Sequence, residues 1–193
     1  MNWQMILNPF TIFSEKHLLI FGVICAIAGS LLASLIGVSY DGLLDVHLRS
    51  EMTFQDSLKE NSIIIILITL ILFVFGKMIN AKTRFIDILN SAVIFRIPFY
   101  LSALLTSIPI VKNVTEEVMK NINSLDKIDL QPSDLIGIVL MSILLLALLI
   151  YAIALLFQGF KTATNAKKTI HYVIFGIIIL IVEITSKLVL SII

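Results

Sequence analysis

Apolar residues along this chain gather into five long runs, and shorter polar stretches separate them. The runs cover about residues 18–38, 62–79, 88–111, 134–157 and 171–193. A helix needs about 20 mostly apolar residues to cross the hydrocarbon core of a bilayer. The pattern therefore predicts an all-α fold: one membrane domain (1–193), a polytopic helix bundle with about five transmembrane helices.

Composition points to the same environment. Of the 193 residues, 59% are hydrophobic and 14% are charged, and the mean hydropathy is +1.04. A soluble domain carries about 25% charged residues, so lipid is the natural solvent for the apolar excess. The net charge of +1 gives no field for nucleic acid. The single cysteine, Cys25, provides neither a disulfide framework nor a clustered metal site.

The distribution of lysine and arginine predicts the orientation. Residues 1–17, which include Trp3 and Pro9, are expected to lie at the membrane–water interface. The stretch 158–170 has three lysines and no acidic residue, which predicts a cytoplasmic N-terminus and an external C-terminus. In this orientation five basic residues lie outside and seven lie on the cytoplasmic side. The seven cytoplasmic residues are Lys16, Lys77, Lys82, Arg84, Lys161, Lys167 and Lys168.

Three charged side chains lie well inside the apolar runs, away from the run ends. A charge inside a span is costly unless it is paired or hydrated. Arg96 and Glu183 lie ~15 Å and ~18 Å into their spans at 1.5 Å per residue, so the two could form an intramembrane ion pair. Lys187, one turn after Glu183, is a competing partner. Pro98 predicts a local break beside Arg96, which fits either a structural lock or a site for a substrate or ion.

Two further surfaces stand out. The first span has stripes of small residues that favour close helix packing, either inside the bundle or against a partner or second copy: Gly22, Ala26, Gly29, Ser30, Ala33 and Gly37. Lys161, Lys167 and Lys168 could contact anionic lipid headgroups or could simply set the orientation. Between the third and fourth spans, Asn113 and Glu116 have capping-box spacing, and Ser133 could cap the fourth span.

Catalytic templates are missing from the sequence. His17, His47 and His171 lie far apart, and there is no HExxH, GxSxG, Walker or CxxC motif. We therefore expect neither an enzyme nor a cofactor.

Several short segments together resemble the Yip-one domain family of small membrane proteins. They are Asn8-Pro9-Phe10, the basic stretch 82–85, residues 96–100, the stretch 158–161 and residues 165–168. The resemblance implies five helices, a cytoplasmic N-terminus and no catalytic residue. The N-terminal region is short, as in compact prokaryotic members, which suggests the bacterial cytoplasmic membrane.

Two functions follow as hypotheses. The first is a non-enzymatic scaffold or adaptor for membrane partners or lipids, based on the small-residue face and the basic loops. The second is a small transporter or channel component that uses Arg96 and Glu183, because charges inside membranes often mark pathways.

Overall fold

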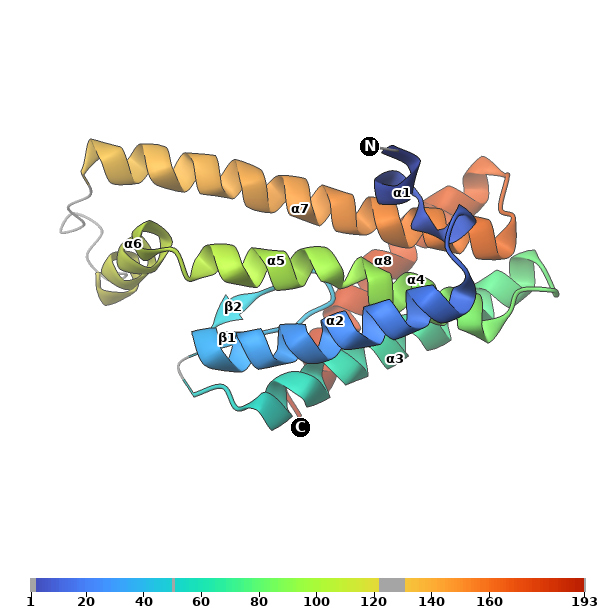
Figure 1. Ribbon diagram of the computed structural model, residues 1–193, viewed down its shortest axis with the longest axis horizontal. Helices are drawn as coiled ribbons and strands as arrows, with labels where there is room; N and C mark the ends of the chain where they lie inside the picture. The colour runs from blue at the N-terminus through green and yellow to red at the C-terminus, as the bar shows by residue number, and fades with distance from the viewer. Residues whose placement is uncertain (1–2, 50, 122–130, 193) are drawn as a thin grey trace.

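The computed structural model describes residues 3–49, 51–121 and 131–192. Five helical segments are long and apolar enough to cross a membrane: α2 (Glu15–Ile36), α3 (Phe54–Ile79), α4 and α5 together (Phe85–Thr106), α7 (Pro132–Thr164) and α8 (Thr169–Leu190). The expected all-α bundle is confirmed, and the chain is a multi-pass integral membrane protein. Figure 1 shows α2, α3, the α4–α5 span and α7 running roughly along the long axis of the molecule, with α8 crossing obliquely behind them.

Polar caps extend the helices beyond the apolar runs. The Ser14 hydroxyl accepts a hydrogen bond from the backbone N–H of His17, and α2 begins at Glu15. Thr53 caps α3 in the same way, so α3 begins at Phe54 rather than at residue 62 as predicted. Helix α7 likewise continues to Thr164 instead of ending at residue 157. Capping side chains and polar turns thus add helix that hydropathy alone does not reveal.

The third span lies at the centre of the bundle and is broken where predicted. Helix α4 (Phe85–Phe95) ends at Arg96, and α5 (Ile97–Thr106) begins one residue later with Pro98 in its first turn. Of the residues in the apolar part of this span, 72% are buried, a far larger share than in the other four spans. It packs against α2, α3 and α7, so the charged residue at its break lies inside the protein.

The N-terminal segment packs along the side of α7. Helix α1 (Trp3–Leu7) and the 3-10 turn η1 (Pro9–Thr11) lie against α7, where the Tyr151 hydroxyl donates to the carbonyl of Ile6 at 2.9 Å. Figure 1 shows α1 beside the C-terminal half of α7. The side chain of Trp3 lies outside the described residues.

The capping residues predicted after the third span are wrong. Helix α6 (Pro109–Lys120) begins with Pro109, so Asn113 lies inside the helix. Likewise Gln131, not Ser133, precedes α7, because Pro132 occupies its first turn. Proline is favoured at this position since its missing N–H would have no partner there.

A small antiparallel sheet joins α2 and α3, a feature that the apolar pattern did not predict. Strand β1 (Val38–Ser39) pairs with β2 (His47–Leu48), with Val38 opposite Leu48. We call residues 37–49 the hairpin loop and the side of the bundle that carries it the hairpin end. The opposite side, where α3 ends and α8 begins, is called the basic end.

Candidate functional site

The hairpin loop folds back into the helix bundle instead of extending away from it. Gly37 reverses the chain with a φ of 77°, a conformation that favours glycine, and its N–H caps α2 by bonding to the carbonyl of Ala33. Val38, Tyr40 and Leu43 are fully buried. Polar backbone groups of the loop are therefore carried into the bundle, where each needs a hydrogen-bond partner.

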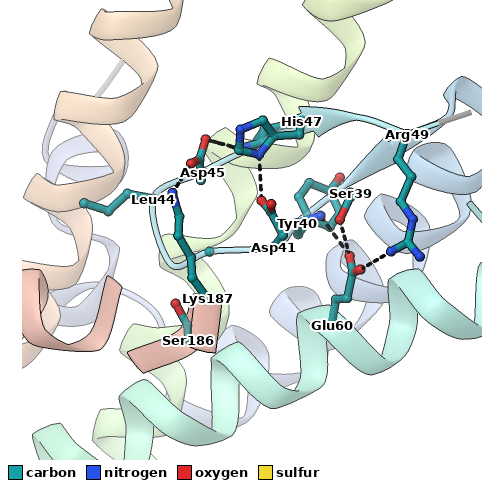
Figure 2. Close-up of polar contacts among 12 residues, drawn as sticks. Ser39, Tyr40, Asp41, Leu44, Asp45, His47, Arg49, Glu60, Ser186 and Lys187 are labelled. Atoms are coloured by element: carbon teal, nitrogen blue, oxygen red, sulfur yellow. Dashed lines mark hydrogen bonds and ion pairs between the residues drawn. The ribbon is translucent and has the colours of Figure 1, made fainter. Parts of the chain in front are cut away.

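Glu60 on α3 supplies one set of partners. Its carboxylate accepts hydrogen bonds from the Ser39 hydroxyl at 2.9 Å, the backbone N–H of Tyr40 at 3.0 Å and the Arg49 guanidinium at 3.2 Å. Figure 2 shows these three contacts converging on one side chain. Glu60 is only 8% exposed, and three donors, one of them cationic, offset the cost of burying its charge.

Arg96 supplies the second set from the break between α4 and α5. Its Nη1 donates to the carbonyl oxygens of Leu43 at 3.0 Å and Gly42 at 3.4 Å, and its Nε donates to the Asn61 side chain at 3.1 Å. The side chain is fully buried. Its guanidinium carbon lies 5.1 Å and 5.0 Å from the ring centroids of Tyr40 and Phe99, within cation–π range.

A hydrogen-bonded network supports this arginine. The Asn61 amide exchanges hydrogen bonds with the Tyr100 hydroxyl and donates to Ser30 at 3.3 Å. The Tyr40 hydroxyl donates to the carbonyl of Gly29 at 3.2 Å. Residues of α2, α3 and α5 are thereby joined around one buried cation, which holds Asn61 in the orientation that Arg96 requires.

Helix α8 supplies the third set of partners. The backbone N–H of Leu43 donates to the Ser186 hydroxyl at 3.1 Å, and that of Leu44 donates to the Glu183 carboxylate at 2.7 Å. Lys187 contacts Glu183 at 3.2 Å and also bonds to Asp45 on the loop. Residues 42–44 therefore form a turn that is bound from two sides. Helix α8 binds its N–H groups, and Arg96 binds its carbonyl groups.

The predicted direct ion pair between Arg96 and Glu183 is not formed. Among the described residues, Glu183 has Lys187 as its ion-pair partner, the competing pairing. The two charges lie at the same level of the bundle, but residues 42–44 of the hairpin loop stand between them and bind both. The depth calculation brought Arg96 and Glu183 to one level of the bundle, but it did not predict that residues 42–44 lie between them.

We refer to Glu60, Arg96, Glu183 and Ser186 together as the clamp. Sequence analysis missed Glu60 and Ser186. Glu60 lies just before the apolar run of α3 and reads as a loop acid, and Ser186 reads as an ordinary small residue. A signal was present in the Glu60-Asn61 pair, since two adjacent polar residues within the first turns of a spanning helix require a buried partner.

Above the clamp, three side chains form an exposed cluster. Asp41 contacts His47 at 2.8 Å, and Asp45 lies 3.6 Å from the same imidazole. Partial burial raises the pKa of Asp45, but its hydrogen bond to Lys187 and the nearby charges lower that pKa more, and the net result is below the usual carboxyl value. The ligand atoms of the three side chains lie within 4.8 Å of one another, a spacing compatible with a cation, although the chain's own His47 and Lys187 already bind both carboxylates.

The small-residue face of α2 packs inside the chain. A Cβ at Gly22 would lie 2.4 Å from Val93 of α4, and one at Gly29 would lie 2.3 Å from the ring of Tyr100 of α5. Ala26, Ser30 and Ala33 are also buried. Gly37 caps the helix rather than joining this face. The close approach of α2 to the third span therefore uses this stripe.

The three lysines proposed to contact lipid lie together at the basic end. Lys161 is on the last turns of α7, and Lys167 and Lys168 are in the short link to α8. All three are exposed, and the Lys161 ammonium lies 5.9 Å from the Tyr172 ring centroid. Contact with anionic lipid stays a prediction.

Comparison with known proteins assigns no family: no protein-family model matches the chain, and neither a curated protein nor a solved structure matches it significantly.

Proposed function

We propose that the protein is a non-enzymatic membrane scaffold that displays the hairpin loop as a fixed docking surface for a membrane partner or for lipid. The clamp is the observation that carries this proposal. Side chains from α3, the α4–α5 break and α8 bind the backbone of one 13-residue loop. A loop ordered before binding loses little entropy on binding, which favours recognition.

The exposed side of the loop offers groups suited to recognition. His47 and Arg49 have side chains that are 54% and 56% exposed, and Asp41 and Asp45 lie beside them. Buried charges such as Glu60 and Arg96 are a costly way to gain stability alone. Because Glu60 and Arg96 hold the polar surface of the hairpin loop in one conformation, they support a role of this loop in binding a partner.

A non-enzymatic role fits the bonding of the clamp. Arg96, Glu183 and Ser186 bind main-chain groups of the loop, which supports a structural role for the three side chains. The resemblance to Yip-one domain proteins agrees with this role and stays a prediction.

Site-specific crosslinking tests the scaffold proposal. A photo-crosslinking residue replaces His47 in the full-length chain, in membranes of cells that express it. We expect an adduct with a partner protein, a second copy or lipid, and we expect Arg96→Met to abolish it because the loop is released. Met78, which is 80% exposed at the basic end, is the matched control position. Adducts at both positions alike, or adducts unaffected by Arg96→Met, would contradict the proposal.

A transporter or channel component is the alternative function, and one observation favours it. The Nη2 of Arg96 is buried without a hydrogen-bond partner among the described residues, and a cavity of about 310 Å³ lies beside the neighbouring Pro98 and Phe99. An anion that reached this guanidinium nitrogen would complete its hydrogen bonding. Efflux of small anions from liposomes distinguishes the two functions: a transporter gives protein-dependent flux that Arg96→Met abolishes, whereas a scaffold gives the flux of empty vesicles.

A further inference from the structure

A groove runs between α2 and α7, and its lining shares no residue with the clamp. Helix α4 packs against both helices, and η1 also contacts both, so α4 forms the floor and the N-terminal segment crosses the groove. The cavity measures about 550 Å³ and is lined almost entirely by apolar side chains, among them Phe13, Leu18, Phe21, Ile94 and Leu155. We call it the apolar groove. Its size is within the range of about 300–1,000 Å³ found for small-molecule sites.

A second cavity, the polar pocket, continues the apolar groove toward the basic end. It measures about 560 Å³ and shares Phe13 and Leu18 with the groove. Its other lining residues include Ser14, Glu15, Arg84, Asp87, Asn90 and Thr162. An apolar channel within the span that opens into a polar chamber at the end of the span has the shape of an amphipathic ligand.

The polar pocket holds more negative than positive side chains. Arg84 lies 2.7 Å from both Glu15 and Asp87 through its Nη2 atom. One guanidinium therefore faces two carboxylates. The pocket can take a further positive group beside the carboxylates, while Arg84 offers a contact for a phosphate.

An unpaired acceptor lies in the same wall. Asn90 is 2% exposed, and its amide Nδ2 donates to the backbone carbonyl of Glu15 at 3.1 Å. Its Oδ1 is buried with no hydrogen-bond partner among the described residues. A buried acceptor is costly to leave unpaired, so a ligand with an N–H or O–H donor would be favoured there.

We propose that the apolar groove and the polar pocket bind one phospholipid with a primary ammonium headgroup. One acyl chain occupies the groove, the phosphate contacts Arg84, and the ammonium donates to Asn90 and the surplus carboxylate. A choline headgroup has no N–H donor for Asn90. An anionic glycerol headgroup meets net negative charge. The inference does not rest on the scaffold proposal.

Lipid competition tests the site. The purified full-length chain is equilibrated with equal amounts of phosphatidylethanolamine, phosphatidylcholine and phosphatidylglycerol, and retained lipid is counted by native mass spectrometry. We expect ethanolamine lipid to exceed choline lipid by about tenfold, the effect of one hydrogen bond to a charged group. Asn90→Leu should retain lipid without this preference.

A bulky variant and its control locate the site. Ala163→Trp adds a ring at a residue that lines the polar pocket and should abolish retention. Gly176→Trp adds the same ring on α8, where a Cβ would have no neighbour within 4 Å, and should leave retention unchanged. Equal retention of the three lipids by the native chain, a preference for phosphatidylglycerol, or full retention by Ala163→Trp would overturn the proposal. Because the native chain reports the preference by itself, a variant that fails to fold does not remove the test.

Discussion

At the scale of single residues, Arg96 is the centre of the clamp. A guanidinium delivers several donors in one plane and stacks on aromatic rings, and Arg96 uses both properties toward two carbonyls, an amide and two rings. A lysine could supply neither the geometry nor the stacking. Removing one partner of a buried polar pair leaves the other unsatisfied, which costs about 3–5 kcal/mol for buried charges.

The first prediction concerns how Arg96 and Glu183 are coupled. Both side chains bind the same turn of the hairpin loop. If one substitution releases the loop, the remaining side chain loses its hydrogen bonds to the loop as well. We expect Arg96→Ala and Glu183→Ala each to lower the free energy of unfolding, and the double variant to lose less than their sum by about 1–2 kcal/mol. Thermal unfolding of detergent-purified protein measures this cycle.

Ser186 provides the control, because it binds the same turn without charge. If the coupling passes through the loop, Arg96→Ala and Ser186→Ala should also be non-additive. A cycle in which only Glu183 couples with Arg96 would instead indicate direct attraction between the charges.

The second prediction concerns pH and Asp45. Burial raises the pKa of Asp45, but the hydrogen bond to Lys187 and the nearby positive charges lower it more, so the pKa in the folded protein is below the usual carboxyl value. Its contribution to stability is therefore complete above the ordinary carboxyl pKa of about 3.9 and disappears as the pH falls through the lower folded value. Because the pair is partly exposed, we expect less than about 1 kcal/mol. The melting temperature of Asp45→Asn should fall below that of the native chain at pH 7 and approach it below pH ~4, and Lys187→Met should do the same.

At the scale of elements, the contact between α2 and the third span decides the architecture. Gly29→Ala places a methyl group 2.3 Å from the Tyr100 ring, which must move away from Asn61. We expect a loss of about 1–3 kcal/mol, typical of overpacking. Gly176→Ala on α8 has open space around it and should be neutral or stabilising by up to about 1 kcal/mol, the helix preference for alanine. Equal melting temperatures for the two variants would show that α2 does not pack closely there.

The spanning helices were predictable because their apolar runs exceed the bilayer thickness, and the break at Arg96 was predictable because Pro98 cannot donate a backbone hydrogen bond. The hairpin loop was not. Val38, Tyr40 and Leu43 are too few and too irregular to form a periodic pattern, and Leu43 binds Ser186, which lies 143 residues away on α8. For the same reason, sequence alone identified Arg96 and Glu183 but not the loop that separates them.

At the scale of the whole molecule, the two ends of the bundle carry different chemistry. The hairpin end holds a folded surface whose charges are largely paired within the chain, as in the contacts Arg49–Glu60 and Lys187–Asp45. The basic end holds exposed lysines and the mouth of the polar pocket, lined by Arg84. A partner docking at one end and a lipid bound from the other would therefore engage the same rigid central span, α4–α5.

The last prediction is the orientation of this asymmetric bundle. Lysine and arginine near span ends favour the cytoplasm, and the basic end carries Lys161, Lys167 and Lys168. We therefore expect the hairpin end to face outward. In a Cys25→Ser background, His47→Cys should react with a membrane-impermeant maleimide on intact cells, whereas Lys168→Cys should react only after permeabilisation. The reverse pattern would move the hairpin loop to the cytoplasm. Its docking partner would then be sought there, and the polar pocket would open to the outer leaflet.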